Sequence, residues 1–168
     1  MRKNKRRGFT VIELLVVLAI IGILGGLIMG AAHSARKQAL VAKARASISS
    51  LETALGMFQS DIGSYPSAGN ANMVTCLISS SGCSIGAGTP ITTSQAANWS
   101  GPYMNFQTNE VTGGTFVDPW GNPYVYKSGS DHGIGANYSD SGYMDIYSFG
   151  PDGLDNNGSG DDVANWRR

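Results

Sequence analysis

The sequence predicts an α+β fold in which one long N-terminal α-helix packs on a small C-terminal antiparallel β-sheet. Two observations predict the helix: residues 14–32 are uncharged and mainly apolar, and an amphipathic pattern then continues to Ile62. A third observation predicts the sheet, because two segments near the C-terminus, residues 124–127 and 143–149, have the β-branched and aromatic content of strands. A helix and a sheet would each leave an apolar face exposed, so packing one on the other is the simplest architecture.

The first 33 residues have the pattern of a membrane segment. Five of the first seven residues are Lys or Arg, and the 19 residues from Leu14 to Ala32 carry no charge. A helix needs roughly that number of apolar residues to span a bilayer. The basic head predicts that the N-terminus stays on the cytoplasmic side of the membrane.

Two simpler interpretations explain this segment less well. A secretory signal peptide also begins with basic residues, but its apolar region spans only about 7–15 residues before the cleavage site. A plain membrane anchor accounts for the length and the basic head but not for Glu13, a carboxylate at the edge of the apolar run. A charge placed at mid-bilayer costs about 2.5–3.5 kcal/mol, so Glu13 is expected to have a partner.

The residues Gly8-Phe-Thr-Val-Ile-Glu-Leu-Leu15, with the apolar run that follows, resemble the class III signal of type IV pilins and pseudopilins. The resemblance implies that a prepilin peptidase cleaves after Gly8 and methylates the new amino terminus at Phe9, and that the apolar helix stays in the mature protein. The new amine would lie four residues from Glu13, so Glu13 of one subunit could neutralise the amine of a neighbour. We expect this pairing to set the register of assembly.

The charge balance and the scattered histidines exclude other classes. The formal net charge is zero, and removal of the leader leaves seven basic and 12 acidic residues, a net charge of −5. No Lys/Arg cluster remains outside the leader, so there is no electrostatic case for nucleic-acid binding. His33 and His132 are far apart in the sequence, and no phosphate-binding glycine motif follows a strand. We expect no enzymatic activity.

After the membrane segment, apolar residues recur at intervals of three or four, which is one face of an α-helix. They are Leu40, Ala44, Ile48, Leu51, Leu55, Phe58 and Ile62. Residues 63–115 are rich in Gly, Ser, Thr and Asn and predict a variable loop region with one short helix near residues 71–78. Cys76 and Cys83 lie in this region and favour a local disulfide, although two free thiols also fit the sequence. A zinc site would need further Cys or His ligands.

Two C-terminal segments carry a narrower resemblance. Asp118-Pro-Trp-Gly-Asn-Pro-Tyr-Val-Tyr126 and Asp145-Ile-Tyr-Ser-Phe-Gly-Pro-Asp-Gly153 resemble the major pseudopilins of type II secretion, the general secretion pathway protein G family. The resemblance implies a type IV pilin-like fold. The expected organisation is a leader at 1–8, a transmembrane or filament-core helix at 9–33, an amphipathic helix at 34–62, a variable loop region at 63–115, and a small sheet with a C-terminal calcium loop at 116–168.

The resemblance also implies function, location and partners. The protein would be a single-pass inner-membrane protein whose C-terminal domain lies in the periplasm. It would polymerise with itself into a pseudopilus that drives export of folded proteins across the outer membrane. Its other partners would be minor pseudopilins, the prepilin peptidase and an inner-membrane assembly platform. The alternative is a type IV pilin or pilin-like surface filament subunit for adhesion or motility. Such pilins commonly close with a disulfide-bounded C-terminal loop, and the absence of Cys after residue 83 favours the pseudopilin.

Residues 152–162 offer side chains suited to a metal ion: four carboxylates, two Asn amides and a Ser hydroxyl. Hard oxygen ligands on a flexible backbone suit Ca²⁺. An EF-hand is excluded because Trp166 stands where the bidentate Glu is required. By composition alone, a calcium site and a solvated acidic turn are equally consistent. The resemblance implies a Ca²⁺ held by the side chains of Asp152, Asp155, Asp161 and Asp162 and by backbone carbonyls near Ser148 and Phe149.

Overall fold

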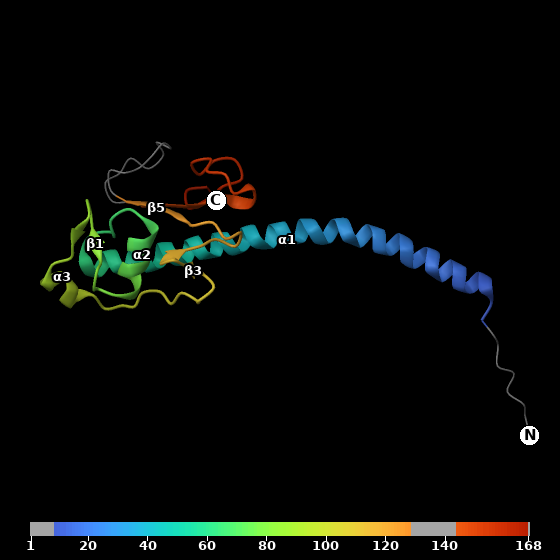
Figure 1. The fold of residues 1–168 in the computed structure, drawn as a ribbon, viewed down its shortest axis with the longest axis horizontal. Coiled ribbons are helices and arrows are strands. Elements are labelled where there is room, and N and C mark those ends of the chain that lie inside the picture. The colour runs from blue at the N-terminus through green and yellow to red at the C-terminus, as the bar shows by residue number, and fades with distance from the viewer. Residues whose placement is uncertain (1–8, 129–143, 168) are drawn as a thin grey trace, which may run out of the picture. The chain divides into compact units, whose positions relative to one another are not determined.

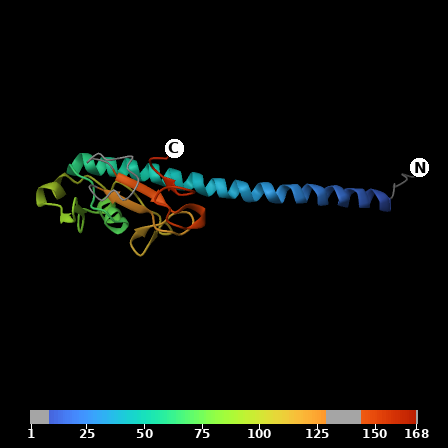
Figure 2. The ribbon, with the colours of Figure 1, turned by 90° about the horizontal axis from the view of Figure 1, so that it is seen from above.

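The computed structural model describes residues 9–128 and 144–167, without the side chains of residues 27–32. The predicted leader, including the cleavage residue Gly8, and His132 lie outside the described residues. The chain divides into two compact units, Met1–Ala39 and Leu40–Arg168. Figures 1 and 2 show the elements of each unit.

Helix α1 runs from Val11 to Ile62, which confirms the predicted long helix. A capping box begins it. The backbone N–H of Thr10 donates to Oε2 of Glu13 at 2.9 Å, and the N–H of Glu13 donates to Oγ1 of Thr10 at 3.4 Å. These bonds satisfy two of the N–H groups that the start of a helix leaves without an intrahelical acceptor.

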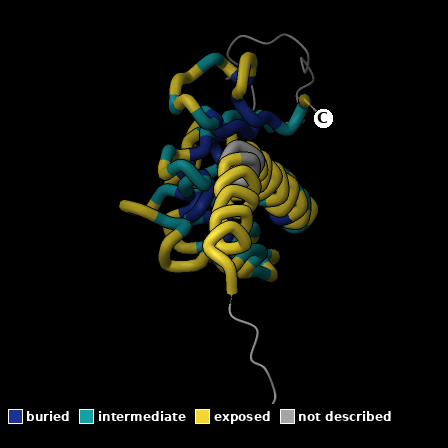
Figure 3. Tube along the Cα trace, turned by 90° about the vertical axis from the view of Figure 1, so that its right-hand side faces the viewer, coloured by how far each residue is buried: buried dark blue, intermediate teal, exposed yellow. Residues whose placement is uncertain are grey.

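Apolar side chains on the first turns of α1 are exposed, as the yellow tube in Figure 3 shows. Phe9 is 76% exposed, Val11 81% and Ile12 72%. Within the part of the chain that the structure describes, no helix combines the length and the apolar content needed to cross a membrane. The side chains of residues 27–32 lie outside the described part, so the membrane helix at 9–33 stays a prediction.

The second half of α1 provides the main apolar face of the second unit. The predicted face is buried from Ala44 to Ile62, whereas Leu40, the first residue of this unit, is 36% exposed. Side chains of α2 and of the largest sheet complete the core on this face. The buried residues of α1 are Ala44, Ile48, Leu51, Ala54, Leu55, Phe58 and Ile62.

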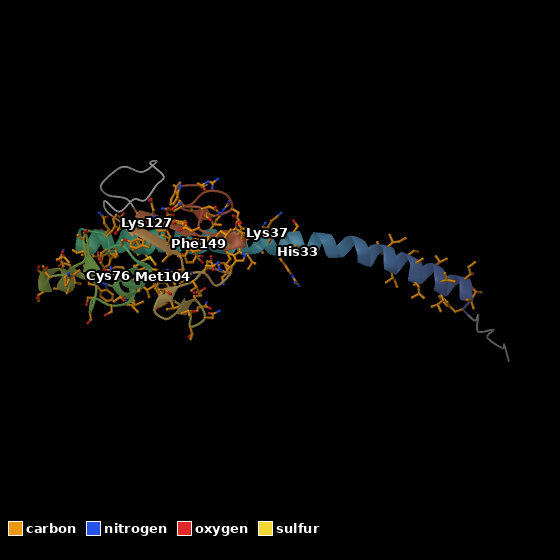
Figure 4. All side chains as sticks on the ribbon, turned by 45° about the horizontal axis from the view of Figure 1, so that its top comes forward. His33, Lys37, Cys76, Met104, Lys127 and Phe149 are labelled. Carbon is orange, nitrogen blue, oxygen red and sulfur yellow. A yellow bond between two sulfur atoms is a disulfide. The ribbon has the colours of Figure 1, made fainter. Side chains whose placement is uncertain are left out.

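The expected loop region contains more regular structure than a single short helix. Helix α2, Asn70–Ile78, confirms the short helix, and Cys76 within it forms a disulfide with Cys83, with sulfur atoms 2.04 Å apart. Figure 4 labels Cys76. The other elements are too short to show a periodicity in sequence. They are β1 (Ser84–Ile85), β2 (Thr89–Pro90), α3 (Thr93–Asn98), β3 (Val111–Thr112) and β4 (Thr115–Phe116).

The largest sheet has three antiparallel strands in the order β5-β6-β7. β5 is Val125–Ser128 and β6 is Met144–Ser148, which confirms the two predicted strands to within one residue. β7, Val163–Ala164, was not predicted because it is only two residues long. Figures 1 and 2 show β5 and β6 beside the second half of α1, where Ile146 joins the core.

Asn70 connects α2 to the two backbone segments that contain Phe116 and Tyr124. Its Nδ2 donates to the backbone carbonyls of Phe116 (2.8 Å) and Tyr124 (2.6 Å), and its Oδ1 accepts from the N–H of Phe116 (2.7 Å). The amide is buried, so these bonds form away from competing water. Asn70 thereby fixes α2 to β4 and to the start of β5.

Asn165 extends the sheet beyond β7 with its side chain. Its Oδ1 accepts from the N–H of Ile146 (3.0 Å), and its Nδ2 donates to the carbonyl of Met144 (3.0 Å). The same Nδ2 donates to Oε1 of Glu52 on α1 at 3.1 Å. The C-terminal segment is therefore tied to both β6 and α1.

Asp61 holds a loop against the last turn of α1. Its Oδ2 accepts hydrogen bonds from the hydroxyl of Ser100 and from the hydroxyl of Tyr103, the latter at 2.8 Å. These two bonds, the one from Ser100 first, lower the pKa of Asp61. The ionised carboxylate is therefore favoured in the folded protein.

We predict that Asp61→Asn removes a pH-dependent part of the stability. Because the folded-state pKa of Asp61 is lowered, its contribution is complete above the unfolded pKa of about 3.9 and is lost as pH falls through the folded value. Urea unfolding at several pH values should find the variant less stable than the wild type near pH 7. The two should converge toward pH 3. A constant difference across this range would show that the ionisation of Asp61 contributes nothing.

Candidate functional site

The loop that joins β6 to β7 contains the predicted calcium segment. Figure 4 labels Phe149 at its start, and the 3₁₀ turn η1, Gly150–Asp152, follows. Gly150 has φ +69°, and a Cβ atom there would lie 2.3 Å from the carbonyl oxygen of Asp161. A glycine is required because the start of the loop passes so close to its end.

Asp162 is the buried carboxylate of this loop, with 7% of its surface exposed. Its Oδ2 accepts from the N–H groups of Asn156 (3.0 Å) and Gly158 (2.7 Å), whereas its buried Oδ1 has no hydrogen-bond partner among the described residues. Burial raises the pKa of Asp162, and the charges of Asp155 and Asp161 act in the same direction against the two backbone bonds. A cation near Oδ1 would stabilise the ionised carboxylate.

Asp152 and Asp161 are exposed and lie where the two ends of the loop meet. Oδ2 of Asp161 accepts from the N–H of Asp152 at 3.3 Å. Oδ1 of Asp152 accepts from the N–H of Leu154 at 2.8 Å, which forms a local turn. The two predicted residues are thus joined by a hydrogen bond from the backbone of Asp152 to the side chain of Asp161.

Asp155 is the fourth predicted carboxylate, and it is anchored from the sheet. Its Oδ1 accepts from the hydroxyl of Tyr147 on β6 (3.1 Å) and from the N–H of Asn157 (2.9 Å). The ring of Tyr147 lies 6.2 Å from that of Phe149, measured between centroids. Asp155 and Phe149 therefore share Tyr147 as a neighbour.

Ser148 is fully buried at the end of β6 and turns its side chain toward a different segment. Its hydroxyl donates to Oδ2 of Asp118 at 2.5 Å and accepts from the N–H of Gly150 at 3.0 Å. Asp118 begins the Asp-Pro-Trp-Gly-Asn-Pro turn that precedes β5. The turn and the loop are thus linked through one hydroxyl.

The C-terminal segment packs on the other side of the loop. The guanidinium of Arg167 donates through Nη1 to the carbonyls of Gly158 (3.2 Å) and Gly160 (3.4 Å). The ring of Trp166 meets that of Tyr147 edge to face at 5.8 Å between centroids. The guanidinium of Arg167 and the ring of Trp166 therefore help to hold the loop in place.

The loop offers oxygen donors of the kind that a hard cation binds, but the structure does not gather the four predicted carboxylates into one group. Among residues 9–128 and 144–167, no three His, Cys, Asp or Glu side chains form a group that could hold a metal ion. Calcium, however, also accepts backbone carbonyls, Asn oxygens and water as ligands. The unpartnered Oδ1 of Asp162 is a ligand atom of the required kind, and the nearby charges of Asp155 and Asp161 add negative potential.

Sequence reasoning missed Asp118, Tyr147 and Arg167 as residues that shape the loop. Asp118 was expected only in a turn, and Tyr147 only in a strand. The one available signal was an acidic residue that opens a Pro/Gly/Asn turn, a position where side chains often accept from the backbone. The contacts of all three join residues distant in the sequence or depend on the course of the loop, which periodicity does not reveal.

The second candidate site lies at the start of α1. Phe9, the predicted methylated terminus, is 76% exposed. Glu13 is also exposed, and its carboxylate accepts from the N–H and the hydroxyl of Thr10, at 2.9 and 2.8 Å. Within the single chain, Glu13 therefore caps its own helix.

Comparison with known proteins identifies the family. The family model described as Type II secretion system (T2SS), protein G, matches residues 31–166. The chain belongs to the type II secretion system protein G family. A second model, the prokaryotic N-terminal methylation motif, matches residues 3–29. The protein G match contains the whole loop, and the methylation motif contains Phe9 and Glu13.

Relatives in the protein G family align with this chain over nearly its whole length. It is 31% identical over 167 residues to the type II secretion system core protein G of Pseudomonas aeruginosa, covering 99% of each chain. It is 31% identical over 164 residues to the core protein G of Escherichia coli, covering 97% of this chain and 92% of that protein. The predicted family is thereby confirmed.

A solved structure is also similar: the major pseudopilin from the type 2 secretion system of enterohaemorrhagic Escherichia coli. Its TM-score is 0.49 at 20% sequence identity, and the likeness covers 79% of this chain and 87% of that chain.

We predict that Gly158→Ala destabilises the protein more than Gly160→Ala. Both glycines have positive φ, +72° and +59°, so both alanines carry backbone strain. A Cβ atom at Gly158 would lie 2.1 Å from Cζ2 of Trp166, whereas at Gly160 its nearest neighbour would be Nδ2 of Asn156 at 3.5 Å. Urea unfolding should show an additional loss of about 1–3 kcal/mol for Gly158→Ala. Equal losses would mean that Trp166 moves aside without cost.

Proposed function

We propose that this chain is a structural subunit that polymerises into the periplasmic pseudopilus of a type II secretion system and contributes to export of folded proteins across the outer membrane. The exposed apolar surface of α1 carries the proposal. From Val11 to Leu24, large apolar side chains remain between 43% and 81% exposed in the single chain. Exposed apolar surface on this scale marks an interface with other proteins or with lipid.

Other features of the family support this role. The relatives from Pseudomonas aeruginosa and Escherichia coli are named core proteins of type II secretion systems. We propose that the chain is anchored once in the inner membrane with its second unit in the periplasm. Its partners are copies of itself, minor pseudopilins, the prepilin peptidase that cleaves after Gly8, and an inner-membrane assembly platform. The chain itself supplies no catalytic step.

Glu13 is proposed to direct assembly by pairing with the amino terminus of Phe9 in a neighbouring subunit. Phe9 and Glu13 are both exposed in the single chain, so they are accessible to a second copy. In an apolar bundle of helices, each charge alone would be strongly unfavourable, and the pair would be tolerated. The capping box formed with Thr10 gives Glu13 a second role, and an alanine variant would remove both.

We predict that Glu13→Gln fails to assemble even though it retains the cap. Gln can accept from the N–H of Thr10 through its amide oxygen, but it carries no charge. Filament yield in cells that express each variant, measured by shearing and electron microscopy, should fall at least tenfold for both Glu13→Gln and Glu13→Ala.

The two Glu13 variants separate the charge from the cap. Normal filaments from Glu13→Gln together with loss in Glu13→Ala would assign the effect to helix capping. Normal filaments from both variants would refute a role of Glu13 in assembly. Long surface filaments formed by the wild type without overexpression would favour a type IV pilin over a pseudopilus subunit.

We further propose that the C-terminal loop binds Ca²⁺, with Asp162 as the central ligand and Asp152, Asp155 and Asp161 as further donors. Backbone carbonyls near Ser148 and Phe149 are proposed to complete the shell. The buried Oδ1 of Asp162, with no hydrogen-bond partner among the described residues, supports this assignment. When bound, the ion would supply the positive charge that offsets the burial of the Asp162 carboxylate.

We predict that calcium raises the melting temperature of the full chain in detergent by several degrees and that Asp162→Asn abolishes this rise. A ligand at one hundred times its dissociation constant stabilises the folded state by about 2.7 kcal/mol. Thermal melting with EGTA and with added Ca²⁺ provides the measurement. Asp61→Asn is the matched control. Asp61 lies at the C-terminal end of α1 and is not a proposed ligand, so this variant should keep the rise. An unchanged wild-type melting temperature would refute the calcium site.

A further inference from the structure

Asp118 is a buried carboxylate that accepts hydrogen bonds from three groups of the protein. It is 5% exposed. Its Oδ1 accepts from the N–H groups of Trp120 (3.0 Å) and Asn122 (2.8 Å), and its Oδ2 accepts from the hydroxyl of Ser148 (2.5 Å). Both oxygens are thus occupied, in contrast to Asp162. Asp118 is therefore suited to positioning neighbouring groups and not to binding a metal ion.

The hydroxyl of Ser148 links Asp118 to the loop. It donates to Asp118 and at the same time accepts from the N–H of Gly150, the first residue of η1. A hydroxyl donates once, so the bond to the carboxylate orients its lone pairs toward that N–H. The position of Gly150 therefore depends on the carboxylate of Asp118.

Gly150 is a point where the two ends of the loop lie close together. A Cβ atom there would lie 2.3 Å from the carbonyl oxygen of Asp161, so the backbone of Gly150 packs directly against that of Asp161. Asp161 is followed by Asp162, the buried carboxylate. Two residues beyond Gly150, the N–H of Asp152 meets Oδ2 of Asp161 at 3.3 Å. Fixing Gly150 thus fixes the spacing between Asp152 and the pair at 161–162.

We propose that Asp118, acting through the hydroxyl of Ser148, is a positioning residue that holds the start of the C-terminal loop in the arrangement that binds the cation. This inference rests on the calcium site proposed above and adds to it a residue in another segment, 30 positions before Ser148 in the chain. Partners that orient metal ligands without touching the metal typically change metal affinity 10–100-fold when mutated.

The test compares Ser148→Ala with Ser128→Ala in the full chain in detergent. Ser128 is a matched control: it lies in the same sheet, is 6% exposed, and donates a buried hydrogen bond to the carbonyl of Pro66 at 2.6 Å. Both variants lose one buried hydroxyl and should melt at lower temperature. Isothermal titration with Ca²⁺ should find the dissociation constant raised 10–100-fold in Ser148→Ala and changed less than twofold in Ser128→Ala.

Two further measurements keep the proposal testable if Ser148→Ala folds poorly. Asp118→Asn preserves the size of the side chain but replaces the acceptor for Ser148 with a donor, and it should weaken calcium binding to a similar extent. Amide hydrogen exchange in EGTA should be faster at Gly150 in Ser148→Ala and in Asp118→Asn than in the wild type. In Ser128→Ala the exchange at Gly150 should be unchanged.

The outcomes separate this inference from the calcium site itself. The wild type could bind Ca²⁺ while Ser148→Ala, Asp118→Asn and Ser128→Ala bind it with equal dissociation constants. This result would overturn the positioning role and leave the calcium site standing. Unchanged amide exchange at Gly150 in Ser148→Ala and in Asp118→Asn would also overturn the positioning role. No heat of binding in the wild type would remove the calcium site, and the positioning role would fall with it.

Discussion

The burial of one face of α1 is the constraint on which the second unit depends. The strands around it are short, and several are only two residues long, so backbone pairing alone gives them little stability. The apolar side chains from Ala44 to Ile62 supply a continuous surface on which these segments pack. The strands β4, β5 and β6 join this core through Phe116, Tyr126 and Ile146, and the hydrogen bonds then select their conformation.

Polar side chains supply much of that selection. Asn70 and Asp118 bond to backbone groups outside the named strands, and Asn165 bonds to β6 beyond the two residues that pair with β7. Such bonds are worth most where water is excluded, and an unmatched buried donor or acceptor is costly. This cost makes the unpartnered oxygen of Asp162 conspicuous: among the described residues, the hydroxyl of Tyr124 is the one other buried side-chain oxygen or nitrogen atom without a hydrogen-bond partner.

The parts of the fold with a repeating pattern could be predicted from the sequence. The helix that ends at Ile62, α2, β5 and β6 have apolar periodicity or strand composition over enough residues to be recognised. α3 and β7 have too few residues for a pattern, and β7 forms only because the loop returns to β6. For the loop, composition indicated oxygen ligands. It could not distinguish buried Asp162 from exposed Asp152, because burial depends on how the chain folds back.

The side chain of Asn165 has a consequence for how copies of this chain can associate. β7 pairs with only Tyr147 and Ser148 of β6, and this would leave the rest of that strand as an open edge. Exposed edges are templates on which another chain can add a strand, the route to aggregation at high concentration. The amide of Asn165 occupies the N–H of Ile146 and the carbonyl of Met144 on that edge. The side chain of Asn165 thereby blocks the addition of a strand from another copy at this part of β6.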